Sequence, residues 1–324
     1  MGIQSDSRNQ RHQFGHAHHA CAEMIIAVVG VTASGKSDLA LDIAQHLGGE
    51  IVSADAYQLY KGMDIGTAKV TASQQRGIRH YQLDQLEICE KASVAAYQKA
   101  ARADILRIYE RGKVPIIAGG SGLYVRAVLD KINFPGTDAR VRARLEQQLA
   151  EAGPGELRRR LERLDPKAAT TIEPNNLRRI VRALEVIEIT GKPFTANLPD
   201  GQYFQPTLQI GLDRADIDQR VGARTRAMFD AGFVSEVETL VTRGLLDSPT
   251  AQFATGYQQV ISHLAGDISR DEAIGQTALA TRQLVRKQRK WFRRDKRIHW
   301  FSAGEQALRQ TFKLFSLAER ENLS

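Results

Sequence analysis

The chain has 324 residues, 42% of them apolar, and a formal net charge of +8. This length and composition favour a globular protein with one large domain, or a core with one smaller domain. No run of about 18 apolar residues occurs, so the sequence predicts no membrane span. The two cysteines, Cys21 and Cys89, are too few for a disulfide framework or a four-ligand zinc site, and we expect a reducing, cytoplasmic setting.

The first 22 residues are polar and lack the apolar segment of a signal peptide. They include a histidine-rich tract with His12, His16, His18 and His19. A metal site is conceivable there, but the tract precedes the first predicted strand and has no packing pattern. We therefore expect a disordered leader over residues 1–22.

The first part of the chain alternates between strand and helix patterns. Short apolar runs rich in β-branched residues predict strands at residues 23–30, 50–55 and 113–120. Helical spacing predicts helices at residues 36–47 and 93–111. This alternation indicates an α/β fold with a right-handed, mostly parallel sheet and helices on both faces.

From about residue 137 to residue 191 the pattern is helical, highly charged and free of strand signals. It predicts an inserted all-helical domain, which we place at residues 133–200. The core then comprises residues 23–132 and 201–324. Its second part should contain a strand at 206–213, helices near 216–243 and 271–294, and a last strand at 297–301.

A glycine-rich turn separates the first predicted strand from the first predicted helix. Gly30, Gly35, Lys36 and Ser37 have the spacing of a phosphate-binding P-loop. Backbone N–H groups and the helix N-terminus would bind a phosphate, Lys36 would reach its terminal oxygens, and Ser37 would bind Mg²⁺. The predicted loop comprises Gly30, Val31, Thr32, Ala33, Ser34, Gly35, Lys36 and Ser37. A plain strand–helix turn is the less favoured alternative.

Nucleotide hydrolases and kinases with such a loop normally carry an aspartate at the end of a second apolar strand. The run at 113–120 is followed by Ser121 after two glycines instead, which weakens that interpretation. Asp55 ends another predicted strand, at the sheet edge where active sites of open α/β sheets collect. We interpret it as a general base or a Mg²⁺ ligand facing the P-loop, rather than as a solvated turn residue.

Residues 282–297 carry nine lysines or arginines against one aspartate. A positive stripe is predicted from the three- or four-residue spacing of Arg282, Arg286, Lys290, Arg293 and Arg297. The apolar face of the same helix should pack on the core. We favour contact with RNA phosphates over a solvated helix face, because a single sign of charge extends over about four turns.

Six blocks, in their order along the chain, resemble those of the tRNA dimethylallyltransferases. They are GVTASGKS, SADAYQLYKGMDIGTAK, GGSGLY, NNLRRIVRALEV, TGYQQ and TRQLVRKQRKWFRRD. The resemblance implies a P-loop NTPase-like parallel sheet flanked by helices, with an inserted all-helical domain. It also implies transfer of a dimethylallyl group from dimethylallyl diphosphate to N6 of the adenosine 3′ of the tRNA anticodon, giving N6-isopentenyladenosine. The P-loop would then hold the leaving diphosphate rather than ATP.

The resemblance also implies roles for single residues. Asp55 would be the catalytic base, Gln58 would face the target adenine, and Ser121 would match a catalytic threonine. Ser37 and Asp55 would hold Mg²⁺. The residues expected to contact tRNA are Asp55, Ala56, Tyr57, Gln58, Ser121, Asn176, Arg178, Arg179, Arg182, Gly256, Tyr257, Arg282, Arg286, Lys287, Arg289 and Lys290.

Three positions depart from the family pattern. Val31 replaces a proline of the P-loop, Ser121 keeps the hydroxyl of the threonine it replaces, and Ala56 replaces a serine. The loss of the hydroxyl at residue 56 puts one hydrogen bond near Mg²⁺ or phosphate in doubt, not the activity.

Prenyl transfer also requires groups whose roles the six family blocks do not assign. An arginine should neutralise charge on the departing diphosphate. Arg220 and Arg224, one turn apart in a predicted helix, are the candidates for a catalytic arginine, and a solvated helix face explains them equally well. Tyr57, Tyr60 and Tyr124 could stack on an adenine that leaves the anticodon stack, or could simply be buried.

Three other functions stay open at this point: a nucleotide kinase or NTPase, a non-catalytic RNA-binding protein, and an enzyme that prenylates free adenine nucleotides. The helical insertion and the basic helix favour tRNA over a free nucleotide. We expect a monomer that binds the tRNA anticodon stem-loop and dimethylallyl diphosphate, and no membrane.

Overall fold

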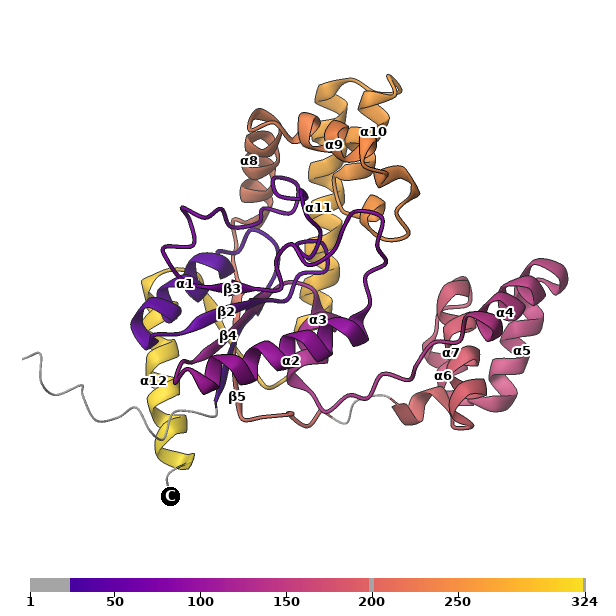
Figure 1. Ribbon diagram of the computed structural model, residues 1–324, viewed down its shortest axis with the longest axis horizontal. Coiled ribbons are helices and arrows are strands. Elements are labelled where there is room, and N and C mark those ends of the chain that lie inside the picture. Colours follow the sequence, from indigo (N-terminus) through magenta and orange to yellow (C-terminus); the bar gives the residue numbers. More distant parts are fainter. Residues whose placement is uncertain (1–23, 198–200, 323–324) are drawn as a thin grey trace, which may run out of the picture. The chain divides into compact units, whose positions relative to one another are not determined.

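The computed structural model describes residues 24–197 and 201–322. A six-stranded sheet with the order β3-β2-β4-β1-β5-β6 forms the centre of the larger unit (Figure 1). Every strand pair within the described residues is parallel, so the predicted fold class is confirmed. The strands are β1 (Ile25–Gly30), β2 (Glu50–Ser53), β3 (His80–Tyr81), β4 (Pro115–Gly119), β5 (Thr207–Asp213) and β6 (Ile298–Ser302).

The central strand β1 is buried along its whole length, as expected of a parallel strand covered on both faces. Val28 pairs with Ala118 of β4 on one side and with Ile210 of β5 on the other. Because the strands are parallel, their carboxyl ends meet at one edge of the sheet. The P-loop, Asp55 and the Gly-Gly-Ser turn after β4 all follow strands at this edge.

Helices cover both faces of the sheet (Figure 1). One face carries α1 (Lys36–Leu47) and α12 (Glu305–Asn322), which share a core with alternate strand residues such as Ile26 and Val28. α2 (Val94–Glu110) and α3 (Gly122–Leu129) pack on each other and on β4. α12, α3 and the two-residue strand β3 were not predicted from the sequence.

The C-terminal part of this unit contains four further helices. They are α8 (Ile217–Asp230), α9 (Phe233–Thr242), α10 (Tyr257–Leu264) and α11 (Arg270–Phe292). Gly232, with φ of 100°, separates α8 from α9 inside the range predicted as helical. A second core joins α8, α9 and α10 through Phe229, Phe233 and Tyr257, and it includes Tyr60 and Met63 from the long loop after β2.

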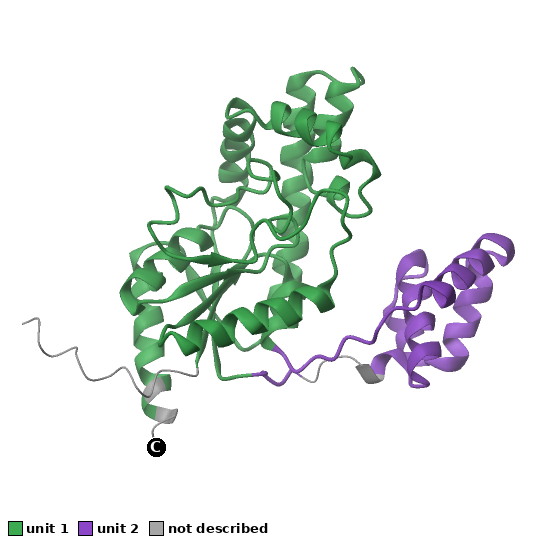
Figure 2. Ribbon diagram, viewed as in Figure 1, with its two compact units in different colours: residues 1–129, 205–324 green, residues 130–204 purple. Residues whose placement is uncertain are grey.

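The chain divides into two compact units, shown in Figure 2: residues 1–129 with 205–324, and residues 130–204. The smaller unit is helical within its described residues. Its helices are α4 (Ala139–Ala152), α5 (Pro154–Leu164), α6 (Pro166–Thr171) and α7 (Leu177–Thr190). Their apolar faces enclose a separate core that includes Leu145, Leu161 and Leu184.

Some predicted boundaries were wrong. β2 ends at Ser53, so Asp55 lies two residues beyond the strand, and α11 ends at Phe292. The predicted positive stripe therefore stops at the helix end: Arg293 is the C-cap, and Arg297 lies beyond it with its guanidinium on Asp295 at 2.6 Å. The predicted leader, residues 1–22, lies outside the described residues. None of the described helices has both the length and the apolar composition that crossing a bilayer requires.

Candidate active site

The P-loop is shaped by a close approach of two backbones. A Cβ on Gly30 would lie 2.2 Å from the carbonyl oxygen of Leu212 in β5, and φ of Gly30 is 133°. No other residue type fits there without moving the strand. Within the described residues, the backbone N–H groups of Gly35, Lys36 and Ser37 donate to no protein acceptor. Together with the N-terminus of α1 they have the arrangement of free N–H groups and helix dipole that is suited to an anion.

Lys36 lies at the start of α1, and its Nζ donates to the carbonyl oxygen of Val31 at 2.6 Å. Burial and the nearby Arg224 guanidinium lower the pKa of Lys36 to about 8, against the opposing attraction of the Asp55 carboxylate. Lys36, Arg224 and Asp55 thus act on one another electrostatically. A charged ammonium here is costly until an anion arrives.

Two side chains from the C-terminal helices support the P-loop. Gln288 of α11 is buried; its Oε1 accepts from Thr32 N at 2.8 Å, and its Nε2 donates to Gly120 O at 3.0 Å. Arg220 of α8 is exposed and donates from Nε to Ala33 O at 3.0 Å. The sequence analysis missed Gln288, because a glutamine inside a run of basic residues carries no signal of its own.

A cavity of about 210 Å³ opens beside the P-loop. Its polar lining includes Asp55, Ser121 and Arg224, and its apolar lining includes Val221, Met228, Ala254 and Leu284. Within the described residues, no hydrogen bond or ion pair to another side chain reaches the Arg224 guanidinium, whose pKa is lowered by burial against the attraction of Asp55. The cavity therefore joins a positive group, a carboxylate and an apolar surface.

Asp55 and Ser121 lie where neighbouring strands end. One carboxylate oxygen of Asp55 accepts from Tyr57 N at 3.0 Å, and the residue lines the cavity. Ser121 Oγ accepts from Ala56 N at 3.2 Å, so the hydroxyl of the GGSGLY block fixes the residue directly after Asp55. The carboxylate is held in place from its own loop and is left open toward the cavity.

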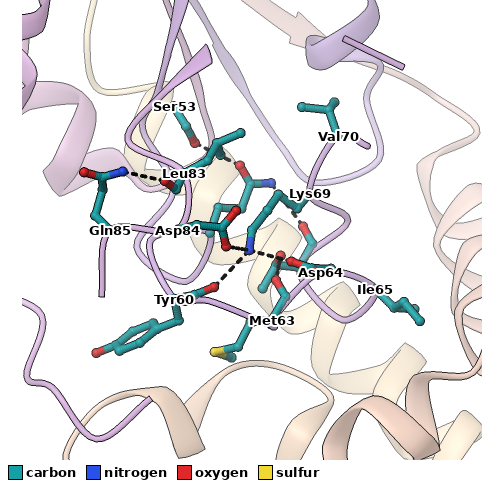
Figure 3. Close-up of polar contacts among 12 residues, drawn as sticks. Ser53, Tyr60, Met63, Asp64, Ile65, Lys69, Val70, Leu83, Asp84 and Gln85 are labelled. Carbon is teal, nitrogen blue, oxygen red and sulfur yellow. Dashed lines mark hydrogen bonds and ion pairs between the residues drawn. The ribbon is translucent and has the colours of Figure 1, made fainter. Parts of the chain in front are cut away.

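Gln58 does not line this cavity. Its Oε1 accepts from Ser53 Oγ at 2.9 Å, and its Nε2 donates to Thr67 O at 3.3 Å. The Gln58 amide thus connects the end of β2, at Ser53, with the later part of the loop, at Thr67. In the same loop the buried Lys69 donates to Asp64 Oδ1 and to Asp84 Oδ1, each at 2.6 Å (Figure 3).

The tyrosines considered for base stacking have different environments. Tyr60 is fully buried, and its hydroxyl donates to Glu90 O at 3.0 Å. Tyr124 is buried against the ring of Tyr97, and burial raises its pKa to about 12. Only Tyr57 of the three is part of the cavity lining.

Gly256 and Tyr257, expected to contact tRNA, begin α10. Tyr257 is fully buried, lines the cavity and donates its hydroxyl to Glu236 at 2.7 Å. Burial, reinforced by the Glu236 carboxylate, raises the pKa of Tyr257 well above its ordinary value. Gly256 has φ of 97° and no room for a side chain beside Phe233 and Thr277. Tyr257 is therefore part of the cavity wall, and Gly256 forms the tight turn that precedes it.

The predicted basic residues of α11 fall into two groups. Arg286, Lys287 and Lys290 are exposed and make no ion pair with a described residue. Arg289 is bound in two-fold fashion by Asp213, at 2.9 and 2.8 Å, and Arg282 lies 4.0 Å from Asp218. The apolar face of α11 was predicted to comprise Val285 and Phe292, with Leu284 and Trp291. Val285 and Phe292 are buried and Leu284 is half-buried, but Trp291 is exposed, so the prediction was wrong for that residue.

The predicted tRNA contacts of the helical unit also divide. Arg178 and Arg179 are exposed, whereas Asn176 is the N-cap of α7 and accepts from Arg179 N. Arg182 donates to Glu185 at 2.8 Å and to Pro135 O at 2.7 Å. Its guanidinium is occupied inside the unit.

The fold and the cavity define a class of protein: a P-loop α/β protein with a cavity beside the loop that is lined by a carboxylate, a guanidinium and an apolar surface. The family model described as IPP transferase matches residues 58–295. The chain is 52% identical over 287 residues to a tRNA dimethylallyltransferase of Streptomyces griseus, covering 88% of this chain and 92% of that one. It is 54% identical over 283 residues to one of Thermobifida fusca, covering 85% and 89%.

Solved structures agree. A tRNA isopentenylpyrophosphate transferase of Bacillus halodurans is 34% identical, with a TM-score of 0.67 over 93% of this chain and 98% of that one. A eukaryotic dimethylallyltransferase acting on tRNA is 24% identical and shares the fold, with a TM-score of 0.75 over 88% and 75%. The chain belongs to the IPP transferase family.

Proposed function

We propose that this protein transfers a dimethylallyl group from dimethylallyl diphosphate to N6 of the adenosine 3′ of the anticodon in tRNA. The bond from the allylic carbon to the diphosphate oxygen breaks, and a carbon–nitrogen bond to N6 forms. The observation that carries the proposal is the shared cavity, in which Asp55 and Arg224 lie together beside the P-loop.

The donor side of the reaction needs stabilisation of a leaving anion. The adenine amine is a poor nucleophile because its lone pair is delocalised into the ring, so the reaction depends on departure of the diphosphate. The Lys36 ammonium is held by Val31 O, the amides at the start of α1 are fixed by the helix, and the Arg224 guanidinium lines the same cavity. Such preorganised donors contribute about 2.7–4 kcal/mol each to transition-state stabilisation.

The acceptor side needs a base. Asp55 would take the proton from N6 as the new bond forms, and the hydrogen bond from Tyr57 N orients its carboxylate. The adenine must leave the anticodon stack to enter the cavity, at a cost of a few kcal/mol. The wall formed by Tyr57 and Tyr257 offers aromatic surface to it.

The oxygen donors near the P-loop fit Mg²⁺. Ser37 and Asp55 are the residues that would hold it, since this ion keeps several waters and prefers one or two carboxylates together with substrate phosphates. Ser37 is exposed in the first turn of α1. Bound Mg²⁺ supplies further charge neutralisation on the leaving diphosphate.

The exposed basic residues are proposed to bind the RNA backbone. They are Arg286, Lys287 and Lys290 on α11, with Arg178 and Arg179 in the helical unit. A single-stranded anticodon loop is the kind of RNA that proteins read by splayed bases. A monomeric, cytoplasmic enzyme stays a prediction.

Incubation of the protein with dimethylallyl diphosphate, Mg²⁺ and an unmodified anticodon stem-loop, followed by mass spectrometry of the RNA, tests the proposal. We expect a mass gain of one isopentenyl unit on the adenosine 3′ of the anticodon. AMP in place of the stem-loop should accept nothing, and ATP should not be hydrolysed. Modification of AMP would favour the free-nucleotide enzyme, and ATP hydrolysis without RNA modification would refute the proposal.

A further inference from the structure

Glu236 of α9 makes an unusual set of contacts outside every motif of the sequence. Its carboxylate accepts from three consecutive backbone N–H groups: Asp64 at 2.9 Å, Ile65 at 2.6 Å and Gly66 at 3.1 Å. It also accepts from the Tyr257 hydroxyl at 2.7 Å. Hydrogen bonds to an ionised acceptor are about twice as strong as neutral ones, so this is a firm connection between α9, α10 and the loop after β2.

The segment that Glu236 holds is part of the cavity wall. Gly66 and Thr67 both line the cavity. Gly66 has no space for a side chain, because a Cβ there would lie 2.4 Å from the ring of Phe233 and 2.6 Å from that of Tyr257. The loop backbone at Gly66 thus packs directly against the rings of Phe233 and Tyr257, and the Glu236 carboxylate fixes the distance between this backbone and the rings.

The same segment is held from its other side by groups of its own loop. The Gln58 amide donates to Thr67 O at 3.3 Å, and Lys69 binds the Asp64 side chain at 2.6 Å (Figure 3). Asp64 is therefore held at two points: its carboxylate forms an ion pair with Lys69, and its N–H donates to Glu236. The path of the loop from Asp55 to Lys69 depends on both interactions.

We propose that Glu236 is a positioning residue for prenyl transfer: it fixes residues 64–66, and with them the part of the cavity wall at Gly66 and the course of the loop that begins at Asp55. The inference rests on the proposed function. Both carboxylate oxygens accept hydrogen bonds, so replacing the carboxylate by an amide sets an NH2 group against N–H or O–H donors, and the segment must shift. Misplacement of a site by about 1 Å can cost about 10²-fold in rate.

Glu236→Gln tests this, with Glu238→Gln as the matched control, because Glu238 is an exposed glutamate of the same helix. We expect single-turnover transfer per titrated active site to fall about 10²-fold in Glu236→Gln, with stem-loop affinity unchanged. Glu238→Gln should match the wild type in both. Counting active sites separates misplacement from partial unfolding, which would lower the number of sites and leave the rate per site intact.

An unaltered rate per site in Glu236→Gln would overturn the proposal. Should that variant not fold, amide hydrogen exchange on the wild type decides: the N–H groups of residues 64–66 should exchange more slowly than that of Thr67, and equally fast exchange would refute the clamp. The two levels of inference fail differently. A wild type that modifies no RNA overturns the proposed function and the kinetic role together, whereas an active wild type with a fully active Glu236→Gln overturns the positioning role alone.

Discussion

The cations of the helical unit's core and the cations beside the cavity of the larger unit differ in their ion pairing. In the helical unit, the buried Glu185 binds Arg142 at 2.5 Å and Arg182 at 2.8 Å, and Glu188 binds Arg160 at 2.5 Å. In the larger unit, Lys36 and Arg224 lie beside a cavity, and no carboxylate among the described residues forms an ion pair with either.

This difference in ion pairing distinguishes charged residues that stabilise the fold from those that are available to bind a ligand. A guanidinium that is neutralised inside its own unit contributes to the fold and has few donors left for a ligand. A buried cation without such a partner is unfavourable in the free protein and becomes favourable only when an anion binds. Motif resemblance does not make this distinction: it assigned Arg182 to tRNA in the same way as Arg178.

The largest effect should come from the carboxylate in the cavity. Asp55→Asn keeps the size of the side chain and an acceptor for Tyr57 N, but cannot take a proton. We expect single-turnover transfer to fall by about 10²–10⁴-fold, the usual contribution of a general base. Stem-loop affinity, measured by filter binding, should stay the same. A variant with a nearly normal rate would remove Asp55 from proton transfer.

The next largest effect separates the two arginines of α8. Arg224→Met removes the buried cation and should slow transfer by about 10²–10³-fold, the equivalent of roughly 2.7–4 kcal/mol. Arg220→Met is the matched control, because Arg220 is exposed and contacts only the P-loop carbonyl of Ala33 among the described residues. Its loss should be smaller. Equal losses would show that exposure does not distinguish the two.

In the helical unit the expected effect is on stability. Arg182→Ala removes one partner of the buried Glu185 and two contacts to the chain before α4, and should cost about 1–3 kcal/mol in urea denaturation. Arg178→Ala, at an exposed position, should change stability by less than about 0.5 kcal/mol and weaken RNA binding. A lower RNA affinity of Arg182→Ala at unchanged stability would contradict the assignment of Arg182 to the fold.

A smaller effect should follow from the pKa of Lys36, which burial and Arg224 lower to about 8. The ammonium that binds diphosphate is present below this pH and is lost above it. Calorimetric affinity for inorganic pyrophosphate should therefore fall above pH 8, by up to about tenfold per pH unit, since one proton is involved. Lys36→Met should remove this dependence. A profile shared by both proteins would assign it to the ligand or to another group.

The sequence was sufficient for five of the six described strands and for the strand–turn–helix arrangement of the P-loop, because buried β-branched runs and a glycine spacing are strong local patterns. It also predicted that Asp55 follows β2, although the strand ends two residues earlier than predicted. It was not sufficient for the groups that support them. Gln288 and Glu236 reach the site across 256 and 170–172 positions of the chain, respectively, and only the packing of distant helices brings them there. The predicted basic stripe was too long because the spacing of Arg297 fits a helix, whereas α11 ends at Phe292. Arg297 lies beyond that end, and its guanidinium donates to Asp295.

The smallest effect concerns the exposed face of α11. Each basic residue that contacts a phosphate contributes about 0.7–0.9 to the slope of log affinity against log salt concentration. Replacing Arg286 and Lys287 by alanine should therefore reduce the slope for stem-loop binding by about 1–2. Arg289→Ala is the control, because its guanidinium is bound by Asp213 at 2.8 and 2.9 Å and should leave the slope unchanged. A reduction in the control as large as in the double variant would mean that an internally paired arginine also binds RNA, and the distinction between charged residues that stabilise the fold and those that bind a ligand would not hold on this helix.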